Sequence, residues 1–389
     1  MRILIASDLY PPGINGVATF SENLAHEMAT RGHEVMVIAP STTRKSHREH
    51  DGKVTLHRIS SLPFKLYPIR FSPLPLDGIH DTFQAFKPDI VHVQSLLEIG
   101  RNTILEARRR HIPVVLTHHA MPENFLENVR IMLPVSQPFK QVMRIYNGYM
   151  SDKAYAVTTP TQTAADIVRL QIDGVRAKVI SNGVDTKRFT PGKADPKLRH
   201  RYNLPEGKPV VAYVGRVDGE KHIGVLLEAL ALVLEHQPVH GLIVGKGRQM
   251  VALRELAHEL GIASHVTFTG FVSDEELPAV YRLADIFAMP SPAELQSITS
   301  LEAMASGLPV LAADAGALPE LCYPDRNGEL FETDDPTSLA NSILRLLAEP
   351  ETIAAYGKQS RAIALTHSID KSIDQFEDLY DYLLEANRG

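Results

Sequence analysis

Apolar segments with the character of β-strands alternate with amphipathic helical segments along this chain, and the alternation runs through twice. Such alternation is typical of parallel strands joined by crossover helices. The first run contains RILIAS (2–7), EVMVIAP (34–40), VTLHRIS (54–60), DIVHVQS (89–95), PVVLTHH (113–119), KAYAVTTP (153–160) and AKVISNG (177–183). The second run contains PVVAYVGR (209–216), HGLIVGKG (240–247), VTFTGFV (266–272), IFAMPS (286–291) and PVLAADAG (309–316).

The stretch between the two runs is rich in proline, lysine, arginine and aspartate. With 389 residues the chain is long enough for two α/β domains. We therefore predict two doubly wound, Rossmann-like domains with parallel sheets at residues 1–183 and 209–368, a linker at 184–208 and a last helix within 369–389. Doubly wound sheets bind ligands at the carboxyl ends of their strands, so we expect a cleft lined by those ends of both sheets.

Composition restricts the compartment and the partners. The single cysteine, Cys322, excludes an intramolecular disulfide and favours a reducing compartment. No run of 18 apolar residues and no cleavage-site pattern is present, so we expect a cytoplasmic protein. The net charge of −6 divides unevenly, because residues 1–185 carry 21 basic against 17 acidic residues and the remainder 19 against 29. The charges are dispersed and lack the aromatic interleaving of RNA-binding proteins, so we expect no nucleic acid partner.

Two carboxylates mark the most informative motif, PSPAELQSITSLEAMASG at 290–307. A strand precedes it, and helical periodicity from Ile298 ends at Gly307, so Gln296, Ser297 and Ile298 supply the first free amides of a helix. Such amides bind phosphate. Glu302 lies one turn further on, where it can accept hydrogen bonds from a ribose diol, and Glu294 precedes the helix, where it can meet a second hydroxylated group. The order of sugar, phosphate and ribose is that of a nucleotide sugar.

The stretch ELQSITSLEAMASGLPVLAADAGALPEL (294–321) closely resembles the donor-binding signature of the retaining glycosyltransferases of family four, whose fold is called GT-B. The resemblance implies that Glu294 contacts the donor sugar and that Glu302 contacts the ribose. At the positions of Gln296 and Ser297 that family usually has an aromatic residue and a glycine. The resemblance also implies a last helix that crosses back to the N-terminal domain.

Further loops at strand ends match the same family. Gly16, in the loop after the first strand, corresponds to the glycine loop beside the donor pyrophosphate. In PVVLTHH the family pattern of threonine, any residue and histidine selects His119, which would orient and stabilise the reacting sugar. Adjacent strand residues point in opposite directions, so only one histidine faces the cleft, and His118 remains the alternative.

The element GRVDGEK resembles the family's paired-cation motif. Arg216 and Lys221 would clamp the pyrophosphate and offset the charge on the departing nucleoside diphosphate. This clamp removes the need for a metal, and the chain has no Asp-x-Asp motif, so we predict no catalytic metal and no cofactor besides the nucleotide sugar as co-substrate. The resemblance also implies that main chain at Phe271 and Val272 meets the nucleobase, which leaves uracil and guanine both open.

The resemblance implies transfer of a hexose from a UDP-glucose-type or GDP-mannose donor to an acceptor hydroxyl by front-face substitution with retention. Residues 58–76 and 124–150 mix aromatic, apolar and basic residues, which suits an anionic membrane surface or an acceptor-site lip. A lipid or lipid-linked acceptor and a peripheral position on the inner face of the cell membrane follow from the first interpretation. The alternatives are a soluble sugar or small-molecule acceptor, a GT-B sugar-phosphate phosphorylase or epimerase, and a non-catalytic nucleotide-sugar-binding protein.

Overall fold

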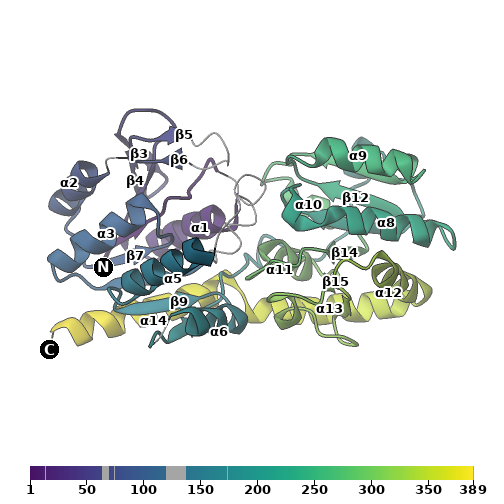
Figure 1. Ribbon diagram of the computed structural model, residues 1–389. Helices are drawn as coiled ribbons and strands as arrows, with labels where there is room; N and C mark the ends of the chain where they lie inside the picture. The colour runs from purple at the N-terminus through teal and green to yellow at the C-terminus, as the bar shows by residue number, and fades with distance from the viewer. Residues whose placement is uncertain (14, 64–69, 74, 120–136, 173, 389) are drawn as a thin grey trace. The chain divides into compact units, whose positions relative to one another are not determined.

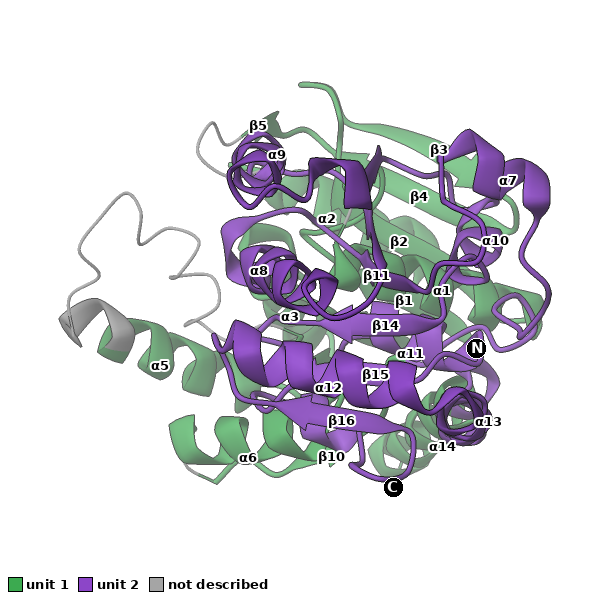
Figure 2. Cartoon of the chain, turned by 90° about the vertical axis from the view of Figure 1, so that its right-hand side faces the viewer, with its two compact units in different colours: residues 1–182, 372–389 green, residues 183–371 purple. Residues whose placement is uncertain are grey.

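The computed structural model describes residues 1–388 apart from 14, 64–69, 74, 120–136 and 173. The chain divides into two compact units. Unit 1 comprises Met1–Asn182 and Ser372–Gly389, and unit 2 comprises Gly183–Lys371 (Figure 2). Parts of both segments that combine aromatic and basic residues, 64–69, 74 and 124–136, lie outside the described residues.

Unit 1 is built on a sheet whose described strands run in the order β10-β9-β8-β7-β1-β2-β4-β3. Strands β3, β4, β7 and β9 of this sheet are labelled in Figure 1. All neighbouring strands pair in parallel except β3, which is antiparallel to β4. The strands are β1 (Arg2–Ala6), β2 (Glu34–Pro40), β3 (His47–Asp51), β4 (Val54–Ile59), β7 (Ile90–Val93), β8 (Val114–Thr117), β9 (Ala156–Thr159) and β10 (Ala177–Val179). A separate two-stranded ribbon pairs β5 (Leu62–Pro63) with β6 (Arg70–Phe71).

Polar side chains cap the first turn of some helices in unit 1. The side chain of Asn15 accepts a hydrogen bond from the amide of Ala18, and Thr161 caps the amide of Ala164 in the same way. The described helices are α1 (Gly16–Thr30), α2 (Leu76–Phe86), α3 (Glu98–Arg109), α5 (Gln137–Ser151), α6 (Gln162–Gln171) and most of α14 (Ile369–Arg388).

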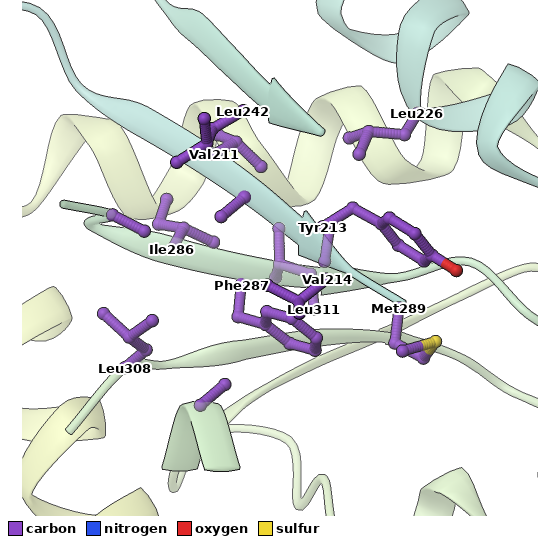
Figure 3. Packing of buried hydrophobic residues seen from close by; sticks show 14 of the residues in the cluster. Val211, Tyr213, Val214, Leu226, Leu242, Ile286, Phe287, Met289, Leu308 and Leu311 are labelled. Atoms are coloured by element: carbon purple, nitrogen blue, oxygen red, sulfur yellow. The ribbon is translucent and has the colours of Figure 1, made fainter. Parts of the chain in front are cut away.

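Unit 2 contains a parallel sheet in the order β13-β12-β11-β14-β15-β16, as far as the structure describes it. Nearly continuous apolar runs form these strands because helices cover both faces of a parallel sheet. The strands are β11 (Val210–Val214), β12 (His240–Val244), β13 (Val266–Gly270), β14 (Ile286–Met289), β15 (Val310–Ala313) and β16 (Gly328–Phe331). Figure 3 shows side chains from the central strands packed together, with Tyr213, Phe287 and Leu311 fully buried.

The helices of unit 2 pack on this sheet, and α8 and α12 lie against each other. The α-helices are α7 (Pro196–Arg201), α8 (Ile223–Leu234), α9 (Met250–Glu259), α10 (Leu277–Tyr281), α11 (Ile298–Ala305), α12 (Pro336–Ala348) and α13 (Pro350–Thr366). Short 3₁₀ turns are η1 (Gly219–Lys221), η2 (Ala263–His265) and η3 (Leu318–Glu320).

Each strand segment that was predicted from the alternating pattern contains a strand in the structure. The prediction of a doubly wound parallel α/β fold is confirmed. The pattern did not predict β3, β16 or the two short strands β5 and β6. The sequence of β3, HREHD, is polar and mostly exposed, so it carries no apolar signal. The predicted helix after Ser297 is confirmed as α11, whose C-cap is Ser306, and Gly307 follows with a φ of +83°.

Residues 184–208, expected as a linker, belong to unit 2. Phe189, Leu198 and Leu204 are buried in its core. The guanidinium of Arg361 on α13 donates to the carbonyl oxygens of Thr186, Phe189 and Ala305 at 2.7 to 2.8 Å. This stretch is therefore a structured part of the unit.

The helix α14 is shared between the units, because its residues from Ser372 onward belong to unit 1. There the rings of Phe376 and Phe20 lie 5.9 Å apart, and the hydroxyl of Tyr380 lies 2.6 Å from Nδ1 of the buried His92. None of the helices in the described part of the chain combines the length and apolar composition that a bilayer crossing needs.

Candidate active site

The loops that follow β11 and β12 touch through their main chains. Gly215 comes directly after β11 and donates its N–H to the oxygen of Val244 at 3.0 Å. A Cβ on Gly245, which has a φ of +131°, would lie 1.9 Å from the oxygen of Gly215. Only glycine fits this approach. The contact sets the position of the residues that follow, beginning with Arg216.

Carboxylates on its own loop hold Arg216. Its Nη1 lies 2.5 Å from Oδ2 of Asp218, and its Nη2 pairs with Glu220. The main-chain amide of Arg248, after β12, also donates to Asp218 at 3.0 Å. The guanidinium is three-quarters buried, and the phenol of Tyr213 donates to the main-chain oxygen of Arg216 at 2.8 Å. This cation is therefore held in place within unit 2.

Lys221, at the end of η1, forms an ion pair with Glu294, which follows β14. Nζ lies 2.5 Å from Oε1, and the two side chains are 17% and 12% exposed. Burial by itself would raise the pKa of Glu294, but the ammonium of Lys221, together with Ser291 and Arg216, lowers it below its ordinary value. Glu294 is therefore ionised at neutral pH.

The loop after β15 fixes the main chain of Glu294. The amide of Ala317 donates to the oxygen of Glu294 at 2.8 Å. Gly316 has a φ of +56°, and a Cβ there would lie 2.6 Å from the same oxygen. Neither residue was predicted as part of the site, although both fall within the motif at 294–321.

The helix start that was predicted to bind phosphate is present as the first turn of α11. Ser297 is the N-cap, and its hydroxyl accepts a hydrogen bond from the amide of Ser300 at 3.2 Å. Its φ of −82° is open to any L-residue, so serine replaces the usual glycine of the motif without strain. Gln296 is buried beside it and Ile298 opens the helix.

Glu302 lies on α11 and is buried against Tyr281 of α10. The phenol donates to Oε2 at 2.7 Å. Burial raises the pKa of Glu302 to about 7, and the hydrogen bond from Tyr281 opposes this rise only in part. Sequence reasoning missed Tyr281, which lies 21 residues away along the chain.

Phe271 and Val272 follow β13 at the same edge of the sheet. The ring of Phe271 is 56% exposed, and Nζ of Lys246 lies 4.8 Å from its centroid. Val272 instead packs against the core of unit 2. Thus unit 2 brings Arg216, Lys221 and Glu294 to the carboxyl ends of parallel strands, as predicted for a ligand-binding edge.

The remaining predicted residues lie in unit 1. Gly16 is exposed and opens α1 directly after its Asn15 cap. The two histidines after β8 make separate contacts: Nε2 of His118 lies 3.0 Å from the hydroxyl of Ser151, and Nε2 of His119 lies 2.7 Å from Oε1 of Gln94. Burial lowers the pKa of His118 to about 4, and burial with the nearby His118 lowers that of His119 to about 3. Of the two, His119 keeps more exposure.

One group of described side chains has the composition of a cation site. Glu22 and His26 of α1 and Asp51 of β3 place one potential ligand atom each within 4.8 Å of one another. All three are half-buried, and Nε2 of His26 lies 2.9 Å from Oδ2 of Asp51. A hydrogen bond between the histidine and the aspartate accounts for their proximity.

Two family models match this chain, each over a different half of the sequence. Residues 194–363 match the family model "Glycosyl transferases group 1", and residues 14–188 match "Glycosyltransferase Family 4". A GDP-mannose-dependent alpha-mannosyltransferase of Mycolicibacterium smegmatis is 29% identical over 99% of this chain and 98% of its own length. An alpha-monoglucosyldiacylglycerol synthase of Streptococcus pneumoniae is 30% identical over 90% of this chain and 79% of its own.

Among solved structures, a sucrose-phosphate synthase from Thermosynechococcus elongatus superposes with a TM-score of 0.82 at 22% identity, covering 99% of this chain and 100% of that one. That likeness concerns the fold. Two Rossmann-like units with these motifs define a nucleotide-sugar glycosyltransferase of GT-B type. The chain belongs to glycosyltransferase family 4.

Proposed function

We propose that this glycosyltransferase moves a hexose from a UDP-glucose-type or GDP-mannose donor to a hydroxyl of a lipid or lipid-linked acceptor, with retention at the anomeric carbon. The observation that carries the donor half is the pairing of Lys221 with Glu294 beside Arg216, at the strand edge where α11 begins. Two cations and a helix N-terminus suit a pyrophosphate.

Acidic side chains of unit 2 neutralise both cations. A pyrophosphate would compete with Glu294 for the ammonium of Lys221, and Glu294 would then be able to accept hydrogen bonds from hydroxyls of the sugar. Arg216 would donate to phosphate from its guanidinium while Asp218 and Glu220 hold that group in place. Glu302 would accept hydrogen bonds from the ribose diol.

The chemistry that suits these residues is front-face substitution. The bond between the anomeric carbon and the β-phosphate oxygen breaks, and the acceptor oxygen bonds to the same face of that carbon. The acceptor's proton passes to the departing phosphate oxygen, whose negative charge Arg216 and Lys221 offset. Because Glu294 is already engaged by Lys221, binding is the role that its contacts support. The enzyme then contributes mainly orientation and charge stabilisation.

The acceptor half of the proposal rests on an exposed apolar face of α5. Val142, Ile145 and Tyr149 are 61%, 63% and 57% exposed, and their spacing of three and four residues places them on one side of the helix. Leu170 of the adjacent α6 is 75% exposed, and Arg144 donates to its main-chain oxygen. Apolar side chains bordered by cations suit the interface of an anionic membrane.

The relative from Streptococcus pneumoniae is named for a glycosylated diacylglycerol, which agrees with a lipid acceptor. A peripheral position on the inner face of the cell membrane follows from this interpretation. A soluble sugar or small-molecule acceptor is the competing outcome.

A two-stage experiment tests the proposal. First, a thermal-shift screen of nucleoside diphosphates and their sugars should identify one donor that raises the unfolding midpoint, since a ligand bound only by the folded chain stabilises it. Second, that donor is incubated with diacylglycerol, polyprenyl phosphate and soluble sugars, and the anomeric configuration of the product is read by NMR. Transfer with inversion, or activity that requires inorganic phosphate, would reject the proposed reaction.

A further inference from the structure

Gln94 occupies a rigid position next to His119. It follows β7 directly, and its main-chain amide donates to the oxygen of Ala6 in the neighbouring strand at 2.9 Å. Gln94 is only 1% exposed. The parallel neighbour β8 ends two residues before His119, so the two side chains meet at the carboxyl edge of the sheet of unit 1.

The contact between them defines the protonation of the imidazole. Oε1 of Gln94 lies 2.7 Å from Nε2 of His119, and an amide oxygen can only accept a hydrogen bond. Nε2 therefore carries the hydrogen, and in the neutral ring Nδ1 is left with a lone pair. The ring of Phe20, whose centroid lies 4.9 Å from that of His119, holds the imidazole plane from one side.

The nitrogen of the Gln94 amide differs from its oxygen. Its Nε2 is buried and finds no hydrogen-bond partner among the described residues. By contrast His92, two residues earlier on the same strand, uses both ring nitrogens, at 2.6 Å from Tyr380 and 2.6 Å from Thr117. A buried NH₂ group without a partner is destabilising, and an apolar side chain of equal size would avoid that cost. The presence of a glutamine at position 94 is therefore explained by the contact of its side-chain oxygen with His119.

We propose that Gln94 is a positioning residue that holds His119 as the neutral Nε2–H tautomer, so that Nδ1 accepts a hydrogen bond from a hydroxyl of the bound sugar. The lone pair would also face the positive charge that develops on the sugar ring, where an N–H group would oppose it. The low pKa of His119 supports this assignment, because the ring stays neutral at physiological pH. The inference rests on the proposed glycosyl transfer for its substrate, whereas the tautomer can be measured without any reaction.

The test uses the full chain labelled with ¹⁵N at histidine, with the His119 resonances assigned by their loss in His119→Asn. In the wild type, the chemical shifts should show a protonated Nε2 and an unprotonated Nδ1. Gln94→Met should abolish this preference, lower kcat by about tenfold or more and leave the unfolding midpoint unchanged or higher, since it removes the unpaired amide. Gln94→Glu, which keeps an acceptor in place, should retain the Nε2–H tautomer and more turnover than Gln94→Met.

A buried amide elsewhere in unit 1 provides the control. The side chain of Asn102 on α3 donates to the oxygen of Glu98 at 2.7 Å, so Asn102→Leu should lower the midpoint while leaving the His119 tautomer and kcat unchanged. A wild-type His119 protonated at Nδ1 would overturn the inference, as would a Gln94→Met variant that loses stability but keeps its tautomer and turnover. A wild type that transfers no sugar would reject the proposed function, and the NMR measurement would still decide the role of Gln94.

Discussion

Nζ of Lys221 and Oε1 of Glu294 lie 2.5 Å apart, although 73 residues separate them along the chain. Each is mostly withdrawn from water, and each is the partner that neutralises the other. The pair holds the two proposed donor-binding groups together before any donor arrives. A bound donor would therefore have to replace the contact between Lys221 and Glu294 by contacts of its own. For this reason, substitutions at these residues should affect binding of the free diphosphate and of the intact nucleotide sugar differently.

Removing either cation should greatly lower the rate of sugar transfer. Arg216→Ala and Lys221→Ala should each lower kcat by on the order of a hundredfold, the scale for losing one preorganised group that stabilises developing charge. Steady-state kinetics with the identified donor provides the measurement. Arg248→Ala is the matched control, because that side chain is 55% exposed and lies 3.9 Å from the same Asp218. Near-normal turnover in both test variants would contradict the clamp.

Substitutions of Glu302 and Glu294 should weaken the binding of different ligands. Glu302→Gln should weaken binding of the free nucleoside diphosphate, because a ribose contact is lost, whereas Glu294→Gln should weaken chiefly the intact sugar donor. Isothermal titration calorimetry with both ligands on both variants measures the difference. Equal weakening of the free diphosphate by the two substitutions would show that the division of roles is wrong.

Stability should depend on pH through Glu302. Its folded pKa of about 7 lies above the ordinary carboxyl value of 4.5, so the folded chain binds the extra proton and its stability falls as pH rises between those values. Glu302→Gln removes this penalty. We expect it to be more stable than the wild type by on the order of 3 kcal/mol at pH 8, and equal to it near pH 4.

Urea unfolding at both pH values, without nucleotide, measures this difference. Glu228→Gln on α8, at a half-buried glutamate of the same unit, is the matched control for the loss of a carboxylate. A stability difference between wild type and Glu302→Gln that stayed constant across the range would argue against the raised pKa.

Transfer should require no divalent metal. Because Arg216 and Lys221 already offset the charge of the leaving group, saturating EDTA should leave the initial rate essentially unchanged in an otherwise metal-free assay. Loss of activity with EDTA and its recovery with magnesium or manganese would refute this prediction. In that case the cluster of Glu22, His26 and Asp51 would be the first place to substitute.

The apolar face of α5 should bind anionic vesicles. Replacing Val142, Ile145 and Tyr149 by serine should abolish cosedimentation with such vesicles at low salt, and high salt should weaken binding of the wild type because it screens the cations. Affinity for the nucleoside diphosphate should be unchanged. Val251→Ser on α9, an equally exposed apolar residue of unit 2, is the control. A wild type that ignores anionic vesicles yet glycosylates a soluble acceptor would exclude the membrane interpretation.

The sequence predicted most of the fold because a parallel sheet covered on both faces requires continuous apolar strands, as in β1 and β11. It also located the ends of these strands, and hence Arg216 and Glu294. What it could not predict were the partners chosen in three dimensions. Nothing local indicates that Tyr281 contacts Glu302 or that Gln94 contacts His119, because each pair joins separate elements.

Two of the expectations from sequence involve residues of both units. The cleft lined by both sheets, and the meeting of His119 with Glu294 around one sugar, stay predictions. The two histidines after β8 were not distinguishable from sequence beyond the family pattern, since alternation shows that they diverge but not which one keeps solvent access. The burial of the two residues supplies that distinction, because His118 is buried and His119 is half-buried.

The shared helix α14 has a practical consequence for building hybrids from this chain and its relatives. Residues 1–182 expressed by themselves would lack Phe376 and Tyr380, and would leave the ring of Phe20 and the imidazole of His92 without the side chains that cover them. A chimera that exchanges only the first half of the gene would therefore combine one protein's sheet with another protein's closing helix. The exchangeable module is discontinuous: its last eighteen residues, 372–389, have to travel with its first 182.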